Sequence, residues 1–300
     1  MWPEQRKKNP WRHSWRLKMD TSIITDRFDI WTEDALGWIG DNGEGLFDFV
    51  SWLLEGSYDG ILWLLQLASP VVVALIAVLL GWRLINLAAG ILAGVALLFC
   101  ATIGLWAETM STLALVTTAT ILALLVGIPL GILAGFAKSL DRVLEPVLDL
   151  IQTMPPYIYL LPAIALLGYG PATALIATVI VAMPPAIRLT SLGIRMTPRE
   201  FIELGHASGL TPWQMFTKIR LPFAIPSVMA GINQSLMMAF GMVVIAGIVG
   251  SGGLGETIYG AVRTLDIATS INAAIAIVIL TMVLDRLTQS AASRAKAGAR

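Results

Sequence analysis

The stretch TLALVTTATILALLVGIPLGILAGFA, residues 112–137, contains no charged side chain. As a helix it would be roughly 39 Å long, because each residue adds about 1.5 Å. That length exceeds the hydrocarbon core of a bilayer, which is about 30 Å thick. A lone proline, Pro129, interrupts the run, and spanning helices tolerate this residue. The stretch therefore predicts a transmembrane helix.

Six further apolar runs of similar length extend this pattern along the chain. They cover residues 61–80, 84–106, 147–168, 172–192, 224–249 and 268–287. The run 147–168 is the least regular, because Pro155, Pro156 and Pro162 lie inside it. The mean hydropathy is +0.76. We predict an all-α polytopic membrane protein with about seven transmembrane helices.

Charge is concentrated near the N-terminus. Charged residues make up 13% of the chain, against about 25% in soluble domains. Residues 1–60 hold 11 of the 20 acidic and 7 of the 20 basic side chains. Within this polar tail, Phe47, Val50 and Leu54 share a helical face, which Phe49, Trp52 and Leu53 widen. We expect an amphipathic helix near 44–58 that is too short to span and lies at the membrane interface.

The rest of the chain divides by its apolar runs. Residues 61–106 are expected to form two scaffold helices, residues 107–290 a core of five helices, and residues 291–300 a cytoplasmic tail. Gly90–Gly94 and Gly127–Gly131–Gly135 have the spacing that lets membrane helices approach closely. We expect them to pack helices within one subunit.

Basic residues in the loops predict the orientation. A cytoplasmic C-terminus places twelve bases in inner loops and only Arg263 in the outer loops after the first span, as the positive-inside rule favours. Seven spans then leave the N-terminus in the periplasm. Residues 1–19 oppose this with six bases, whereas residues 20–60 carry ten acids and one base. Long tails translocate largely regardless of charge.

The sequence lacks the residues that several other classes of protein require. The net charge is zero and indicates no nucleic-acid partner. Cys100, His13 and His206 form no recognisable metal set, so no metal or cofactor is expected on this chain. Ala137-Lys138-Ser139 lacks the glycine of a phosphate-binding loop, and Gly250–Gly255 follows a spanning helix instead of the strand that a dinucleotide site needs. The predicted orientation places Ser251 and His206 on opposite sides of the membrane, which excludes a catalytic pair.

The longest inner loop carries two helix-start signals. Thr197-Pro198-Arg199-Glu200 predicts one short helix, with Thr197 as its N-cap and Gly209 near its end. Thr211-Pro212-Trp213-Gln214 predicts a second, which presents Phe216 and Ile219 on one face and ends before Pro222. Apolar side chains on these helices need a burial partner, which another protein would supply; they are Phe201, Leu204, Trp213 and Phe216.

Here the sequence resembles a known family. Glu203-Leu204-Gly205, Gly209 and Ile219-Arg220-Leu221-Pro222 resemble the cytoplasmic signature of binding-protein-dependent ABC importer permeases. Leu204 and Gly205 stand where that signature has two alanines. The resemblance implies that residues 193–222 are a coupling loop whose first short helix docks in a groove on an ATPase subunit. It assigns ATPase coupling to Glu203, Leu204, Gly205, Gly209, Ile219, Leu221 and Pro222.

Other stretches are similar to glycine betaine/proline-type permeases. They are Gln152-Thr153-Met154-Pro155, Pro184–Thr190, Met229–Gln234, Gly252–Gly255 and Leu284–Gln289. The resemblance implies a homodimer in the bacterial inner membrane, with two ATPase subunits that hold ATP and Mg and one periplasmic binding protein. Choline, carnitine and trimethylamine N-oxide remain alternative solutes. A secondary carrier is an alternative class, although the spans lack the buried acids that such carriers use.

Polar groups inside or beside the spans are candidates for the translocation path. They are Gln152, Thr153, Tyr157, Asn233 and Gln234. Hydrogen bonding between helices is an equally good explanation for them. An aromatic face suits a quaternary ammonium ion, which has no hydrogen-bond donor on its cationic group. Tyr157, Tyr159 and Tyr169 are weak candidates for that role, because a permease that passes its solute on should not bind it tightly.

Overall fold

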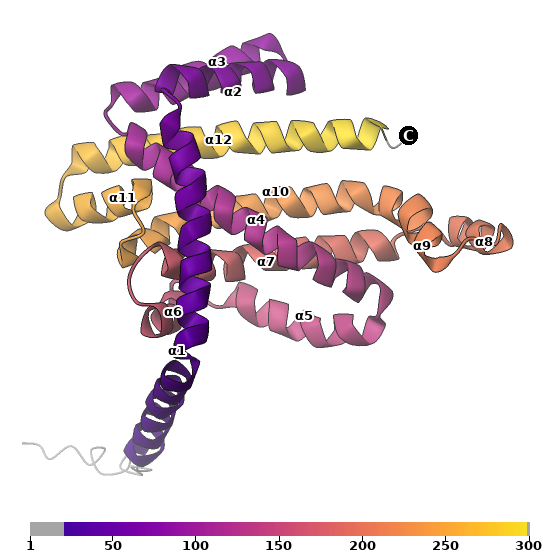
Figure 1. Cartoon of the computed structure of the whole chain (residues 1–300), viewed down its shortest axis with the longest axis horizontal. Helices are drawn as coiled ribbons and strands as arrows, with labels where there is room; N and C mark the ends of the chain where they lie inside the picture. The colour runs from indigo at the N-terminus through magenta and orange to yellow at the C-terminus, as the bar shows by residue number, and fades with distance from the viewer. Residues whose placement is uncertain (1–20, 299–300) are drawn as a thin grey trace, which may run out of the picture. The chain divides into compact units, whose positions relative to one another are not determined.

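The computed structural model describes residues 21–298, and that part of the chain contains helices and turns but no strand (Figure 1). The elements are α1 (Thr21–Leu67), α2 (Pro70–Leu84), α3 (Leu87–Thr102), α4 (Trp106–Phe136), α5 (Lys138–Thr153), η2 (Pro156–Tyr159), α6 (Leu160–Leu167), α7 (Pro171–Arg195), α8 (Arg199–Ala207), α9 (Pro212–Met215), η3 (Phe216–Arg220), α10 (Leu221–Ala246), η4 (Gly247–Val249), α11 (Gly253–Thr264) and α12 (Ile267–Gly298). The chain divides into two compact units at Gly45. The unit from Leu46 onward contains all the predicted spans.

Among residues 21–298, four helices are individually long and apolar enough to cross a membrane. They are Trp106–Phe136, Pro171–Arg195, Pro212–Val249 and Ile267–Arg294. These helices confirm the predicted spans that begin at residues 112, 172, 224 and 268. In Figure 1 they share one general direction. The fold is therefore an all-α membrane fold, as predicted.

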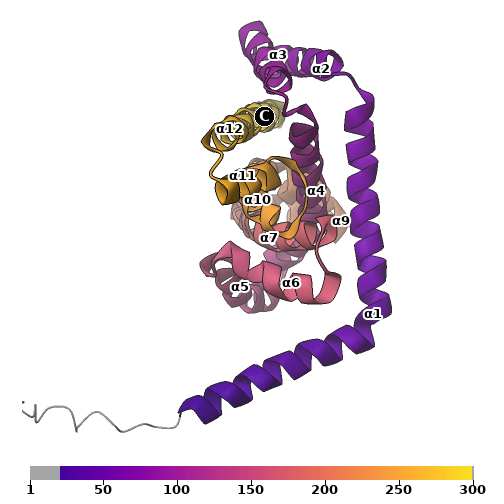
Figure 2. The same ribbon diagram turned by 90° about the vertical axis from the view of Figure 1, so that its left-hand side faces the viewer.

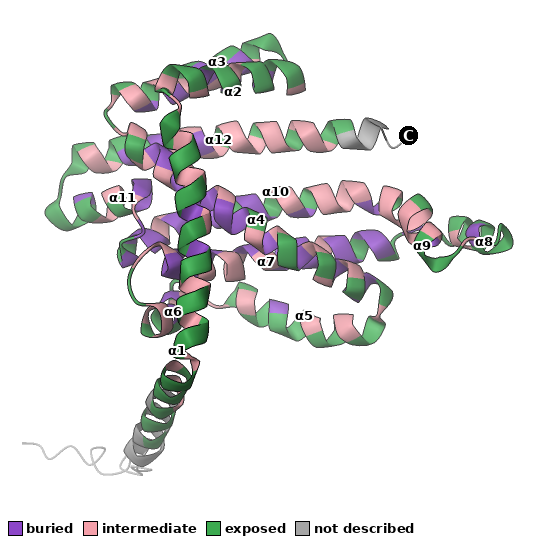
Figure 3. Ribbon diagram, viewed as in Figure 1, coloured by how far each residue is buried: buried purple, intermediate pink, exposed green. Residues whose placement is uncertain are grey.

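The core lies where α4, α7 and α10 pack together (Figure 3). Met110 and Leu115 of α4, Leu175 of α7 and Val243 of α10 are fully buried there. Much of this core consists of alanine, glycine and threonine. Small side chains let helix backbones approach closely, which is how membrane helices gain packing energy without a hydrophobic driving force.

The two glycine repeats pack helices within the chain, as predicted. A Cβ atom on Gly90 would lie 2.4 Å from the carbonyl oxygen of Val78 in α2. A Cβ atom on Gly131 would lie 2.7 Å from the carbonyl oxygen of Ile187 in α7. These glycines are therefore the sites where α3 meets α2 and where α4 meets α7.

The prediction that residues 61–80 form a single spanning helix is wrong. The structure breaks it at Ala68 and Ser69, and α1 and α2 meet at 97°. Ser69 is extended, with φ −63° and ψ 155°. Pro70 favours this break, because the ring of a proline disfavours the helical region for the residue before it.

The predicted span 147–168 is also broken. Helix α5 ends at Thr153, and the next helical segment turns away by 106°. Met154 and Pro155 are both extended there, at ψ 140° and 129°. Pro155 and Pro156 impose this geometry on the residues before them.

The exact number of crossings is not confirmed. If each of the two bent helix pairs is counted as one span, the total rises from four to six. The run predicted at 84–106 forms α3, a shorter apolar helix of 16 residues. Seven spans therefore remain a prediction.

Residues 46–67 of α1 include most of the predicted amphipathic helix and continue beyond it. Figures 1 and 2 show this segment running across the direction of α4 and α10. Leu54 and Tyr58 are buried against the core cluster, with Val50 partly buried beside them. Phe49 and Trp52 are exposed and stack on each other at 6.1 Å. The helix is therefore amphipathic, and its narrower face packs on the bundle.

Candidate functional site

Helices α8 and α9 form a hairpin at the end of the bundle toward which the C-terminal part of α12 also points (Figure 1). The hairpin covers the predicted coupling loop and is the most patterned polar segment of the chain. Its local structure follows from its two helix starts and one glycine.

The first helix start differs from the prediction by one residue. Helix α8 begins at Arg199, and Pro198, not Thr197, occupies the N-cap position without a side-chain cap. The Thr197 hydroxyl instead donates a hydrogen bond back to the carbonyl oxygen of Ile194 at 3.1 Å. Thr197 is buried, so it closes the end of α7 and does not open α8.

The end of α8 confirms the role predicted for Gly209. Leu210 N–H donates to the carbonyl of Gly205, and Gly209 N–H donates to that of His206, both at 3.0 Å. This pair of bonds is a Schellman motif, which needs a left-handed residue after the helix. Gly209 supplies it with φ +70°.

Gly209→Val should loosen this helix end, whereas Gly209→Asn should not. A Cβ atom on Gly209 would meet nothing within 4 Å, so only the backbone conformation is strained. That strain is about 1–2 kcal/mol for most residues, and asparagine visits this region more readily. Limited proteolysis of the loop should be roughly tenfold faster in the valine variant. Equal cleavage of the two variants would contradict the capping role.

The second helix start is confirmed in full. The Thr211 hydroxyl accepts a hydrogen bond from Gln214 N–H at 3.3 Å, and the Gln214 side chain accepts one from Thr211 N–H at 3.0 Å. The two bonds form a reciprocal capping box, which satisfies donors that a helix start leaves free.

The second helix does not end before Pro222, contrary to the prediction. Helix α9 continues through the π-helix η3 directly into α10. Leu221 N–H bonds to the carbonyl of Phe216, five residues earlier. Proline has no N–H and its ring clashes with the carbonyl four residues back, and a π-turn is one way for a helix to widen at such a point. The helix therefore reaches Pro222 without stopping.

Gly205 is the point where α8 touches the following helix. It is buried, and a Cβ atom there would lie 2.6 Å from Met215 Cε and 2.8 Å from Ile219 Cδ1. Both atoms are the far ends of flexible side chains. Met215 and Ile219 thus fill the space that the methyl group of the family's alanine would occupy.

The outward side of α8 carries the exposed groups. Glu203 lies about 200° around the helix from Gly205, and it forms no hydrogen bond or ion pair with the described residues. Leu204 of α8 is 61% exposed, and Trp213 of the following helix, α9, is 71% exposed. We call Glu203, Leu204 and Trp213 the coupling face, after the role that the sequence predicts for this loop. It combines a free carboxylate with apolar side chains that no described residue buries.

Aromatic contacts connect this hairpin to two core helices. Phe201 of α8 lies 4.8 Å from Phe223 of α10, measured between ring centroids. Phe216 lies 5.8 Å from Phe136 at the end of α4, and the Arg220 guanidinium lies 4.7 Å over the same Phe136 ring. A displacement of α8 would therefore reach α10 through the Phe201–Phe223 pair, and a displacement of α9 and η3 would reach α4 through Phe216. Sequence inspection missed Phe136 and Phe223, because they lie outside the loop.

The other predicted coupling residues lie in the same hairpin or directly after it. Ile219 contacts Gly205, as described above, and Leu221 and Pro222 are the first two residues of α10. The structure therefore brings all seven predicted residues into one segment. Of these seven, Glu203 and Leu204 are exposed on α8, whereas Gly205 is buried against the next helix.

Two ion pairs between α5 and α7 were also missed. Asp149 accepts from Arg188, and Asp141 accepts from Arg195 and, at 3.0 Å, from the Ser191 hydroxyl. The spacing of the charges is the signal that was available, because the acids are eight residues apart on one helix and the arginines seven apart on the other. These pairs fix α5 against α7 near the coupling end.

The candidate path residues fall into two groups. Gln152, Thr153 and Tyr157 are exposed at the break after α5. Gln234 is exposed on α10, and η2 packs against the same helix. The Tyr159 hydroxyl donates to the Ile151 carbonyl at 2.9 Å and so connects the two sides of the break.

Asn233 belongs to a hydrogen-bond network between α10 and α12. Its side chain donates to Asp285 at 3.2 Å and accepts from Thr288 at 2.6 Å. Gln289 also donates to Asp285, at 2.8 Å. The structure therefore favours the interhelical explanation for Asn233 over a place in the path.

Comparison with known proteins extends these observations. Residues 127–296 match the family described as "Binding-protein-dependent transport system inner membrane component". The chain is 38% identical over 263 residues to the glycine betaine/proline betaine transport system permease protein ProW of Escherichia coli (strain K12), covering 87% of this chain and 74% of that protein. It is 39% identical over 267 residues to the glycine betaine transport system permease protein OpuAB of Bacillus subtilis (strain 168), covering 89% and 92%.

A solved structure shares the fold. The MetNI methionine ABC transporter, in inward-facing conformations, matches 63% of this chain and 93% of that chain, with a TM-score of 0.54 and 25% identity. The family match runs from the middle of α4 into α12. It therefore includes the whole hairpin, all of α10 and the C-terminal part of α4 that contains Phe136.

Proposed function

The chain belongs to the binding-protein-dependent transport system inner membrane components, and from that premise we propose that it is the permease of an ATP-driven importer of compatible solutes. The coupling face carries this proposal. It offers a free carboxylate and unburied apolar groups on α8 and α9. Phe201 of α8 contacts Phe223 of α10, and Phe216, directly after α9, contacts Phe136 of α4. The relatives named above as glycine betaine permeases support the solute class.

The proposed complex has two copies of this chain, two cytoplasmic ATPase subunits and one periplasmic binding protein. ATP and Mg would bind only on the ATPase subunits, because the sequence has no phosphate-binding loop. Closure of the ATPase pair would push on α8. The Phe201–Phe223 contact would carry the motion into α10, and the Phe216–Phe136 contact of the following segment would carry it into α4. The pathway would then switch between its inward- and outward-facing states.

The proposed orientation has a cytoplasmic C-terminus and a periplasmic N-terminus. It rests on the twelve bases against one in the loops, which the positive-inside rule places in the cytoplasm. The coupling hairpin and the distal end of α12 would then share the cytoplasmic side. Residues 46–67 of α1 would lie along the outer interface, with Phe49 and Trp52 toward the lipid headgroups, where aromatic residues are favoured.

A reconstituted transport assay tests the function. Proteoliposomes with this chain, its ATPase and its binding protein should accumulate labelled glycine betaine only when ATP is inside with the ATPase. Unlabelled choline, carnitine and trimethylamine N-oxide serve as competitors. Strong competition by one of them would reassign the solute without removing the importer mechanism.

The same assay distinguishes an ATP-driven importer from a secondary carrier, which is the alternative class of transporter. Uptake that persists without the ATPase subunit, and that follows an ion gradient, would identify a secondary carrier. A ligand titration of the binding protein alone provides an independent measurement, since selectivity in the proposed complex lies mainly on that partner.

A further inference from the structure

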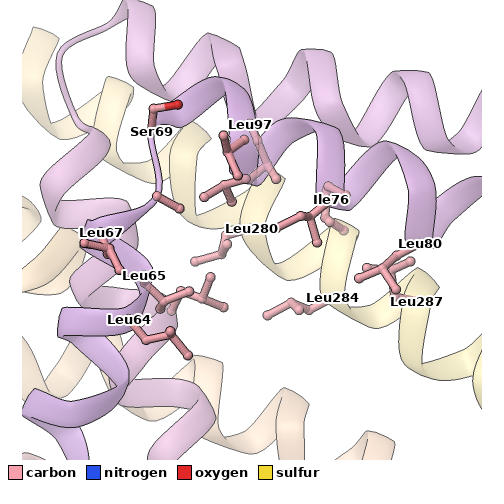
Figure 4. A pocket seen from close by; sticks show the side chains of 16 residues that line it. Leu64, Leu65, Leu67, Ser69, Ile76, Leu80, Leu97, Leu280, Leu284 and Leu287 are labelled. Carbon is pink, nitrogen blue, oxygen red and sulfur yellow. The ribbon is translucent and has the colours of Figure 1, made fainter.

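A cavity of about 830 Å³ lies between the end of α1 and helices α2, α3, α4 and α12 (Figure 4). It occupies the corner that the break before Pro70 creates. Its floor is formed by buried residues, among them Ala77, Leu97 and Leu280. Ser69 supplies the one polar side chain among the lining residues.

Water is a poor occupant of this cavity. By volume the cavity equals about 28 water molecules, at roughly 30 Å³ each. Each buried water needs two to four polar partners, and the lining offers a single hydroxyl, that of Ser69. An empty space of this size is also unfavourable, because its walls lose their van der Waals contacts.

The rim of the cavity is open on the outside of the bundle. Leu64, Val72 and Leu80 line the cavity and remain substantially exposed. For a membrane protein, the surroundings of such a rim are the acyl chains of the bilayer. A lipid tail can therefore enter from the side without crossing a polar barrier.

An apolar wall alone cannot select one lipid, because lipid tails are as apolar as leucine and gain nothing by leaving the bilayer. Selection requires a headgroup contact. Arg83 follows the lining residue Leu80 by three positions on α2, and Arg286 follows Val283 by three on α12, so each lies on its helix next to the cavity face. Both arginines are exposed.

The neighbouring acid does not neutralise this pair of arginines by a direct contact. Asp285 accepts hydrogen bonds from Asn233 on α10 and from Gln289, and it forms no ion pair among the described residues. The charge at this end of the cavity therefore complements an anion. We propose that the cavity binds a phospholipid with an anionic headgroup, its acyl chain inside and its phosphate at Arg83 and Arg286.

Photo-crosslinking in nanodiscs tests this proposal. The assembled transporter is placed in phosphatidylethanolamine nanodiscs with a trace of phosphatidylglycerol that carries a photoactivatable acyl chain, and crosslinks are mapped by peptide mass spectrometry. Crosslinks should concentrate at residues 64–80 and 280–287. An arginine near an anionic surface is worth about fivefold in binding, so labelled phosphatidylglycerol should exceed equally labelled phosphatidylethanolamine by roughly tenfold or more.

Three variants separate the contribution of the lipid headgroup to binding from that of the acyl chain. The double variant Arg83→Gln/Arg286→Gln should reduce phosphatidylglycerol crosslinking to the phosphatidylethanolamine level. Arg294→Gln, an exposed arginine further along α12, is the matched control and should change nothing. Ile76→Trp fills the cavity and should lower crosslinking by both lipids although the arginines remain.

Three results would overturn the proposal. Uniform crosslinking over all exposed apolar faces would mean ordinary surrounding lipid only. Equal crosslinking by the two lipids, unaffected by the double arginine variant, would remove the headgroup preference. Absence of crosslinks in the cavity, with crosslinks elsewhere, would mean that another occupant, such as a second copy of this chain, fills it.

Discussion

Glu203→Lys is expected to abolish ATP-driven uptake while the chain remains folded in the membrane. Glu203 is exposed and contacts no described residue through a hydrogen bond or ion pair, so its loss should cost the fold little. A reversed charge at an interface costs several kcal/mol. With about 1.4 kcal/mol per factor of ten, uptake should fall on the order of a hundredfold.

The measurement has two parts. Uptake of labelled solute reports function, and co-purification of the ATPase subunit reports docking. Glu203→Gln should give an intermediate loss. Glu55→Lys makes the same charge change on an exposed glutamate of α1, away from the hairpin, and should leave uptake unchanged. Normal uptake by the Glu203→Lys variant would refute the coupling assignment.

Gly131→Leu is expected to prevent correct folding, whereas Gly241→Leu is expected to be tolerated. A Cβ atom on Gly131 would lie 2.7 Å from both the Ile187 carbonyl oxygen and Thr190 Cβ of α7. These atoms are backbone or attached to it, so they cannot move aside separately. Overpacking a core by even a few methylene groups costs about 1–3 kcal/mol, and here the α4–α7 interface itself would have to separate.

Gly241 provides the matched control. It lies in α10, is exposed, and a Cβ atom there would meet nothing within 4 Å. Helix propensity predicts that Gly241→Ala stabilises the helix by up to about 1 kcal/mol. Gly131→Ala is expected to destabilise the fold in spite of helix propensity, because its methyl group would clash with α7. Thermal unfolding in detergent, followed by size-exclusion chromatography, distinguishes the two. Similar unfolding temperatures for both alanine variants would show that α4 and α7 do not need the glycine contact.

Local signals predicted the coupling hairpin closely. The reciprocal bonds of Thr211 with Gln214 and the left-handed Gly209 involve residues close together in sequence, so the residue types alone predict them. The start of α8 was wrong by one residue because Thr197 has a competing partner, the Ile194 carbonyl at the end of α7. A hydroxyl near two helix ends can bond to either, and only the folded chain selects one.

Prolines in the apolar runs were harder to interpret. Pro129, Pro184 and Pro226 lie inside continuous helices, whereas Pro70 and Pro155 stand at breaks of 97° and 106°. Spanning helices tolerate proline when neighbouring groups satisfy the freed carbonyls. Whether such neighbours exist depends on packing. The hydropathy of an apolar run therefore does not show whether its proline breaks the helix.

The sequence also left two interpretations open for the polar side chain of Asn233. Its sequence position was compatible with either a path lining or a helix contact, and its partners on α12 are more than 50 residues away. The amide can satisfy its hydrogen bonds within the bundle, and the tertiary structure shows that it does.

The amino-acid sequence by itself determined that this chain is a helical membrane protein whose longest polar loop forms a capped helical hairpin. Both features depend on interactions within one helix or turn, namely apolar length, end caps and a left-handed glycine. Only the tertiary structure decided where the apolar runs break, which polar groups pair between helices, and that a corner between α1 and α2 leaves an apolar cavity. Those features depend on contacts between segments distant in the chain, whose energies no local pattern records.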